Sequence, residues 1–222
     1  MTNVQPLPKA RPTDAPVPTS RAVRETGKRM RSRLLDAAVE LFKAKGLAAV
    51  SVAEIAAAAG AYPSQVTYYF RTKEALFVEA ACREVLYVAR QAEAAAAGAP
   101  TGADYNHRLV ETVIGSPGLA LFVEALSLTR RRQDLSPLVE RTFERLHAEG
   151  DRAYADTRRS RGWSSPEDPA TVARRFWTLA LGVALREGAT EATVAQAVEE
   201  MTALLRAAPI TREPANFLPG DA

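Results

Sequence analysis

The chain has 222 residues, 47% hydrophobic and 25% charged, a composition typical of one sizeable globular core or two small ones. No run of about 18 uninterrupted apolar residues occurs, and the proline-rich start lacks the apolar stretch of a secretory signal. The composition therefore predicts a cytoplasmic protein without a membrane partner. The single cysteine excludes an internal disulfide. With only two histidines besides, a metal site built from protein side chains is not expected, and we expect no cofactor.

The net charge of +3 is unevenly distributed along the chain. Residues 21–73 hold ten Lys or Arg and four Asp or Glu, whereas residues 74–222 hold seventeen basic and twenty-one acidic residues. This asymmetry is either a chance distribution on solvated faces or a sign that the first third contacts a polyanion such as DNA.

The first 50 residues are predicted to be an arm followed by a helix. Residues 1–22 contain five prolines and are expected to form a disordered arm. Apolar residues recur at helical spacing from Glu25 onward. Gly46 supplies a residue that tolerates the left-handed conformation, so we expect this helix to end there.

Two short helices separated by a glycine are predicted next. The first covers residues 52–59, with Ser51 as its N-cap and Glu54 three residues later completing a capping box. Gly60 follows at the turn, where a small residue that adopts positive φ is needed. The second covers residues 63–70 and starts with a proline in its first turn. This is the arrangement of a helix-turn-helix.

Six more helices complete the expected fold. One should run from residue 73 to about 97, and the other five are predicted over about 104–114, 117–132, 136–161, 169–187 and 191–207. No segment shows sustained two-residue alternation. The predicted fold class is therefore all-α, with about nine helices. Its expected divisions are an N-terminal three-helix DNA-binding domain (residues 23–72), a larger helical domain (residues 73–208) and a loose tail (residues 209–222).

The stretch VSVAEIAAAAGAYPSQVTYYFRTKEALF resembles the TetR family of bacterial transcriptional repressors. The matching elements are Ser51, Glu54-Ile55-Ala56, Gly60, Tyr68-Tyr69-Phe70 and Lys73-Glu74-Ala75-Leu76, and the preceding RLLDAAVELFKAKG is similar to the family's first helix. The resemblance covers about residues 30–80 and implies a sequence-specific repressor of operator DNA. Tyr62, Thr67 and Ala61 depart from the family pattern, so the operator sequence stays open.

In helix-turn-helix proteins the second helix enters the major groove with its N-terminal residues at the base edges. This geometry directs five side chains toward DNA: Tyr62, Ser64, Gln65, Thr67 and Tyr68. The amide of Gln65 can pair bidentately with adenine, so Gln65 is the best candidate for base reading. Contacts to the phosphate backbone are expected from Arg29, Ser51, Tyr69 and Lys73. Tyr68 and Tyr69 could instead pack in the small core of the domain.

A single domain of this kind buries little surface against DNA. Specific, tight binding is therefore expected to need a homodimer that reads two half-sites. Apolar stripes on the last two predicted helices would form a four-helix interface. Its expected residues are Val172, Phe176, Leu179, Val183, Val194, Val198, Met201 and Leu205. The alternative is that these helices only cover their own core.

The family resemblance implies that a small molecule in the C-terminal domain releases the repressor from its operator. We expect this unidentified effector to be hydrophobic or amphipathic, because most pockets are apolar with a few polar groups. A pocket among the middle helices would be lined by Tyr105, His107, Leu109, Phe122, Leu126, Phe143, Leu146 and Trp177. The alternative for each of these residues is that it packs in the protein core. Cys82 is expected to be a small core residue.

Two other functions are compatible with the sequence. The first is a ligand-independent regulator or an activator, and the second is a helical enzyme or carrier. The sequence contains no recognisable nucleophile–base pairing, phosphate-binding loop or metal-ligand spacing. We therefore expect that the protein is not an enzyme.

Overall fold

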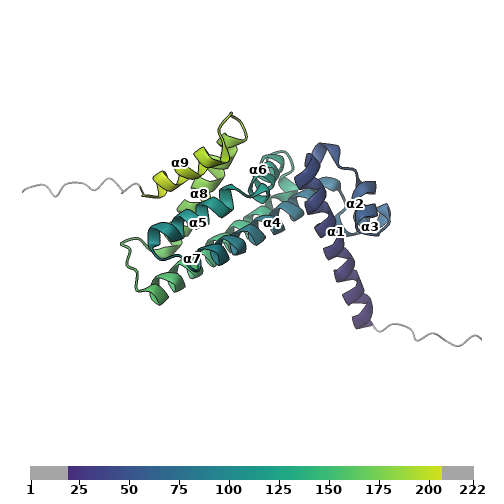
Figure 1. Ribbon diagram of the computed structural model, residues 1–222. Helices are drawn as coiled ribbons and strands as arrows, with labels where there is room; N and C mark the ends of the chain where they lie inside the picture. Colours follow the sequence, from purple (N-terminus) through teal and green to yellow (C-terminus); the bar gives the residue numbers. More distant parts are fainter. Residues whose placement is uncertain (1–19, 207–222) are drawn as a thin grey trace, which may run out of the picture.

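The computed structural model describes residues 20–206, with side chains from residue 24 onward. In that part of the chain it contains nine α-helices, one 3₁₀ turn and no strand, which confirms the all-α prediction (Figure 1). The elements are α1 (Ser20–Ala49), α2 (Val52–Ala58), α3 (Pro63–Phe70), α4 (Lys73–Ala96), α5 (Gly102–Ile114), α6 (Pro117–Thr129), η1 (Gln133–Leu135), α7 (Ser136–Arg161), α8 (Pro169–Glu187) and α9 (Val194–Arg206).

The start of α1 differs from the prediction. The helix begins at Ser20, so residues 20–22 are helical and do not belong to a disordered arm. The rest of the predicted arm and the predicted tail lie outside the described residues. Gly46 has φ +74° and ψ 167°, which interrupts the helical path at the position where the sequence predicted an end.

Side-chain caps explain where several helices begin. The Ser51 hydroxyl accepts the Glu54 N–H and the Glu54 carboxylate accepts the Ser51 N–H, so the predicted capping box of α2 is present. The prediction for the last helix was wrong by one turn. The Thr190 hydroxyl donates to the Arg186 carbonyl at the end of α8. Thr193 caps α9 by accepting the Gln196 N–H.

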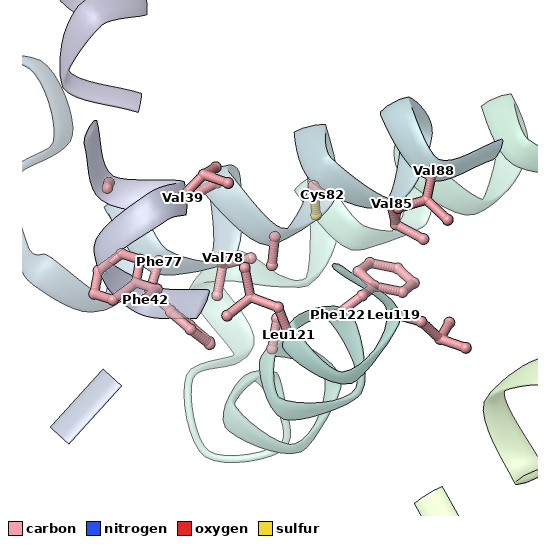
Figure 2. Packing of buried hydrophobic residues seen from close by; sticks show 14 of the residues in the cluster. Val39, Phe42, Phe77, Val78, Cys82, Val85, Val88, Leu119, Leu121 and Phe122 are labelled. Carbon is pink, nitrogen blue, oxygen red and sulfur yellow. The ribbon is translucent and has the colours of Figure 1, made fainter. Parts of the chain in front are cut away.

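Helix α4 is the centre of the molecule and packs against α1, α3, α5, α6 and α7. Its N-terminal half meets α1 and α6 in a dense apolar layer (Figure 2). There the ring of Phe42 from α1 packs edge-on against Phe77, with ring centroids 5.1 Å apart. Phe122 of α6 is completely buried in the same cluster, which extends as far as Met201 of α9. The helix-turn-helix and the C-terminal helices therefore share one continuous core.

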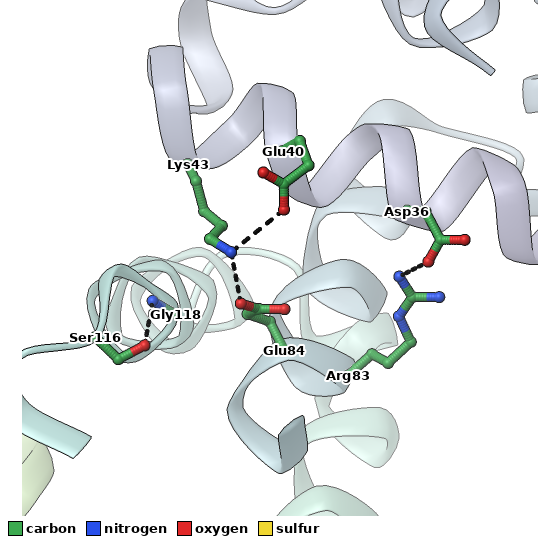
Figure 3. A network of polar contacts seen from close by, with 7 residues as sticks. All are labelled: Asp36, Glu40, Lys43, Arg83, Glu84, Ser116 and Gly118. Atoms are coloured by element: carbon green, nitrogen blue, oxygen red, sulfur yellow. Dashed lines mark hydrogen bonds and ion pairs between the residues drawn. The ribbon is translucent and has the colours of Figure 1, made fainter. Parts of the chain in front are cut away.

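Ion pairs lie beside this layer and join α1 to α4 (Figure 3). The Lys43 ammonium lies 2.7 Å from a carboxylate oxygen of Glu84, whose side chain is buried. Arg83 pairs with Asp36 at 2.6 Å in a more exposed position. Gly118 lies at the start of α6, where an added Cβ would come within 2.7 Å of the Glu84 Cγ. Helix α6 therefore approaches the Lys43–Glu84 pair closely because residue 118 has no side chain.

Within residues 20–206, no single helix has the length and apolar composition needed to cross a membrane. Helices α5 and α6 meet those two criteria only when taken together, and they are bent at 63° to one another. The same residues contain no group of three or more His, Cys, Asp or Glu side chains placed to hold a metal ion.

Candidate DNA interface and ligand pocket

A small buried wedge fixes the angle between α2 and α3. Ile55, Ala59 and Val66 are all buried, as the helix-turn-helix spacing predicted. Gly60 at the turn has φ +60°, and the Arg33 guanidinium donates to the Ala59 carbonyl beside it. A side chain at residue 60 would be strained by this φ, and its Cβ would lie 2.7 Å from the Arg33 guanidinium. The turn therefore requires glycine.

The outer face of α3 presents large aromatic side chains to solvent. Tyr62 and Tyr68 are 76% and 80% exposed, and Ser64 and Thr67 are exposed as well. Residues 64, 67 and 68 follow the spacing of one helix face. Tyr69 is half-buried, and its ring packs edge-on against Tyr68 with centroids 5.0 Å apart. The structure therefore brings four of the predicted DNA-contacting side chains together at the N-terminal end and outer face of α3.

Gln65 has a second task that the sequence analysis missed. Its side-chain carbonyl oxygen accepts the backbone N–H of Tyr62 at 3.0 Å. Tyr62 occupies the N-cap position but lacks the short oxygen-bearing side chain that usually caps a helix. Gln65 thus caps α3 from within, and its NH₂ group makes no hydrogen bond with the described residues and can donate elsewhere.

The other predicted backbone contacts lie in different environments. The Lys73 ammonium donates to the carbonyls of Leu47 and Val50, at 2.9 and 2.8 Å. Lys73 therefore joins the start of α4 to the end of α1. Arg29 is exposed on the part of α1 that extends away from the body of the molecule (Figure 1). Ser51 is exposed at the start of α2.

Charge and hydrogen bonding around Glu54 strengthen the start of α2. The Ser51 backbone N–H and then the Lys45 ammonium, at 3.0 Å, lower the pKa of Glu54 to about 2. The carboxylate is therefore ionised at neutral pH and lies near the positive end of the helix dipole.

A pocket of about 320 Å³ lies in the C-terminal part of the molecule, among α4, α5, α7, α8, α9 and the segment between α7 and α8. Four of the residues predicted from the sequence line it: Tyr105, Leu109, Leu146 and Trp177. The other four do not. His107 is exposed. Phe122 and Leu126 pack in the core cluster, because α6 faces α4 and α1, and Phe143 of α7 packs against Phe122.

Small residues on facing helices leave the space for this pocket. They are Ala89 and Ala92 on α4, Gly150 and Ala153 on α7, and Ala173 on α8. An added Cβ at Gly150 would lie 3.2 Å from the Ala173 Cβ, so the two helices approach closely beside the pocket. Small residues give no periodic signal of large apolar side chains, so none of them was among the lining residues predicted from the sequence.

Four charged side chains also line the pocket. Glu167 and Arg175 form a bidentate ion pair. Glu149 accepts the Arg145 side chain at 2.6 Å. Glu93 is half-buried, and its pKa is raised by burial and then by the charge of Glu149.

The predicted dimer residues divide into three groups. Val183, Val198 and Met201 are buried within the protomer. Val172, Phe176 and Leu205 line the pocket. Leu179 is half-buried against the core and Val194 is exposed. The large exposed apolar side chains of α8 and α9 are Leu185, Val194 and Leu204.

Cys82 is buried beside the junction of α4 with α7 and lies outside the pocket. Burial raises the pKa of its thiol to about 11, so the thiol is neutral at physiological pH. This agrees with the expectation of a small core residue.

Two family models match the chain: one of bacterial regulatory proteins of the tetR family at residues 34–80, and one of the C-terminal part of bacterial transcriptional repressors at residues 102–206. A solved structure of an inferred transcriptional regulator from Rhodococcus sp. RHA1 is 38% identical, covers 79% of this chain and 93% of its own, and superposes with a TM-score of 0.69. The chain belongs to the TetR family of bacterial transcriptional regulators.

Other TetR-family folds match at lower identity. An inferred regulator from Mesorhizobium loti MAFF303099 is 21% identical, covers 81% of this chain and 94% of its own, and has a TM-score of 0.61. The multidrug binding protein EbrR, complexed with imidazole, is 26% identical, covers 83% and 95%, and has a TM-score of 0.52. A search of curated proteins found no significant match.

Membership in the TetR family confirms the resemblance drawn from residues 30–80 and identifies α2 and α3 as the helix-turn-helix of a DNA-binding regulator. Repression, the effector, the dimer and the individual residue roles stay predictions.

Proposed function

We propose that this TetR-family regulator is a cytoplasmic homodimeric repressor. It reads operator DNA through the N-terminal half of α3 and is released by a hydrophobic or amphipathic small molecule bound in the pocket. The observation that carries the proposal is the exposure of Tyr62 and Tyr68 on a helix whose opposite side is held by the buried wedge of Ile55, Ala59 and Val66. Large aromatic side chains that remain in solvent at such a position are suited to an interface.

The proposed DNA contacts use the groups that the protein leaves available. The Gln65 NH₂ group donates to a base edge, and Tyr62 and Tyr68 contact a thymine methyl group or a phosphate. Tyr69, Ser51 and Arg29 contact the backbone. Lys73 is assigned a different task, because two carbonyls already occupy its ammonium. It braces the helix-turn-helix through two of its three N–H donors.

The proposed dimer uses the exposed apolar side chains of α8 and α9. Leu185, Val194 and Leu204 would be covered by the partner, and Gly182 leaves open space for close helix approach. This surface replaces most of the stripe chosen from the sequence, because the latter is largely internal to the protomer. A symmetric pair would present two copies of α3 to half-sites about one helical turn apart.

The proposed release mechanism uses the shared core. A ligand in the pocket touches α4 at Ala89, Ala92 and Glu93, and the same helix holds Lys43 of α1 through Glu84. A ligand that prefers one position of α4 therefore also favours one position of the DNA-binding helices. The EbrR structure shows a small-molecule complex on a related fold, which supports an effector for this chain as well. The pocket favours this reading over a ligand-independent regulator.

The experiment that tests the proposal is selection of bound sequences from random DNA with the full-length protein. We expect a two-fold symmetric site with half-sites about 10 base pairs apart. A motif without this symmetry, or no enrichment of any sequence, would contradict the proposed dimeric reading of DNA.

Gln65→Glu sharpens this experiment, because the carboxylate can still accept the Tyr62 N–H but has no NH₂ group. We expect its affinity for the selected site to fall by roughly 10–100-fold, with little change in melting temperature. Gln91→Glu is the control, since Gln91 is exposed on α4 and the charge change is the same. An equal loss on random DNA would show that Gln65 contributes no base reading.

A further inference from the structure

We infer that the effector is a cationic amphiphile, whose positive group lies between Glu93 and Glu149 while its apolar part fills the aromatic pocket. This inference rests on the proposed effector function of the pocket and adds the chemical class of the ligand.

The first argument is the balance of charge among the lining residues. The pocket is lined by three glutamates and one arginine. Arg175 donates through both terminal nitrogens to Glu167, so this cation is already neutralised. The two remaining charges, on Glu93 and Glu149, are both negative. The side chains that line the pocket therefore carry a net negative charge.

The second argument is the incomplete pairing of these two carboxylates. Glu93 makes no hydrogen bond or ion pair with the described residues, although it is half-buried, and the exposed Arg90 and Arg152 act on it only through longer-range attraction. Glu149 accepts one hydrogen bond, from Arg145 to its Oε1 atom, which leaves Oε2 available. Burial and then the repulsion from Glu149 raise the pKa of Glu93, and a cation between the two carboxylates would relieve this repulsion.

The third argument is the chemistry of the walls. Tyr105 and Trp177 are nearly fully buried, and Phe176 packs edge-on against Trp177 with centroids 5.6 Å apart. Aromatic faces attract organic cations and also bury alkyl groups. The adjoining wall already holds one cation this way, since the Arg158 guanidinium lies 5.6 Å from the Tyr154 ring centroid.

An anionic effector fits these observations poorly. Among the described residues, the only cation on the pocket wall is Arg175, and an anionic effector would have to displace Glu167 from its bidentate pair. It would also approach the unpaired carboxylate of Glu93 and the free Oε2 atom of Glu149. A neutral amphiphile would fill the space but leave the charges as they are.

The test measures binding of three probes with the same alkyl chain to the full-length protein. Octyltrimethylammonium, 1-octanol and octyl sulfate differ in the charge of the head group, and each is titrated calorimetrically below its micelle-forming concentration. We expect the cation to bind at least tenfold more tightly than either of the others, because a charged partner in a partly buried site contributes more than a neutral one.

Glu93→Gln and Glu149→Gln identify the residues responsible. Each should weaken octyltrimethylammonium binding roughly tenfold and leave octanol binding unchanged. Glu124→Gln is the matched control, because burial also raises the pKa of Glu124 but this residue lies on α6 outside the pocket. Its affinity for all three probes should equal that of the wild type.

The outcomes separate the inference from the proposed function. Equal binding of the three probes, tighter binding of octyl sulfate, or glutamine variants that bind the cation like the wild type would overturn the cationic effector while keeping an effector pocket. Absence of binding by all three probes would remove the effector site itself, and the inference with it.

Discussion

The two halves of α4 do different things with the same helical backbone. In the N-terminal half, large side chains such as Phe77 and Val78 fill the space toward α1 and α6, and the buried Glu84 has a cation beside it. In the C-terminal half, the positions that face the pocket include Ala89 and Ala92, and Glu93 has no hydrogen-bond or ion-pair partner among the described residues. One half is complete in the free protein, whereas the other has unfilled volume and unbalanced charge. This contrast is consistent with the proposed effector function, in which the second half binds the ligand and the first half connects it to α1.

The largest expected effect on stability comes from replacing an alanine by leucine in each half of α4. Ala80→Leu places three carbons in a filled layer, because Ala80 is completely buried there, and should lower the free energy of unfolding by about 1–3 kcal/mol. Ala92→Leu projects into the pocket, so it should leave stability unchanged or raise it by up to about 1 kcal/mol. Denaturant unfolding measures both. A similar cost for the two variants would remove the distinction between a filled and an open half.

A smaller effect is expected from the ion pairs that join α1 to α4. Lys43→Met leaves the buried Glu84 carboxylate without its cation and should cost about 1–2 kcal/mol at pH 7. Arg83→Met is the control, because the Arg83–Asp36 pair is exposed and should be worth less than about 1 kcal/mol. Equal costs would show that burial of Glu84 adds nothing to the pair.

The Lys43 pair also predicts a dependence on pH. Burial lowers the pKa of Lys43, but the hydrogen bond and the charge of Glu84 raise it by more than burial lowers it. The pKa of Lys43 is therefore raised above its ordinary value of 10.5. A raised lysine pKa stabilises the folded state fully below 10.5, and this stabilisation is lost as the pH rises through the higher folded value. The stability difference between wild type and Lys43→Met should therefore shrink in that alkaline range. A difference that stays constant there would contradict the pairing.

The smallest expected effect lies at the start of α2. The pKa of Glu54 is lowered to about 2, so its contribution to the cap is present above pH 4.5 and is lost as the pH falls from 4.5 toward 2. An NMR titration of the Glu54 carboxyl carbon measures this directly. Lys45→Met should move the pKa part of the way back toward 4.5, since the Ser51 N–H remains. Titration of wild-type Glu54 near 4.5 would show that the capping box is not populated in solution.

Local signals in the sequence predicted the helix-turn-helix well, because its determinants lie within a few residues of one another. The Ser51–Glu54 box, Gly60 and the buried wedge of Ile55 and Val66 are all in place. The start of α9 was harder to predict, because two nearby threonines are both suitable N-caps. Thr190 and Thr193 are both acceptable caps, and the choice of Thr193 depends on Gln196 three residues later.

The pocket was predicted only in part, because tertiary packing decides which apolar faces meet. Phe122 and Phe143 have the same chemistry as Trp177, but α6 turns Phe122 toward α4 and away from the pocket. The space itself comes from side chains that are small, such as Ala92 and Gly150, and a search for periodic large residues does not detect them. Glu93 was missed for a related reason, since a charge on a helix is ordinarily assigned to a solvated face.

The ammonium of Lys73 has a consequence for the entropy of DNA binding. By donating to the carbonyls of Leu47 and Val50, it links the two ends of the segment that contains α2 and α3. The conformational freedom of that segment is therefore lost when the protein folds and not when it meets the operator. A reading surface that is ordered in advance pays less entropy on association, so more of each contact made by α3 remains as affinity.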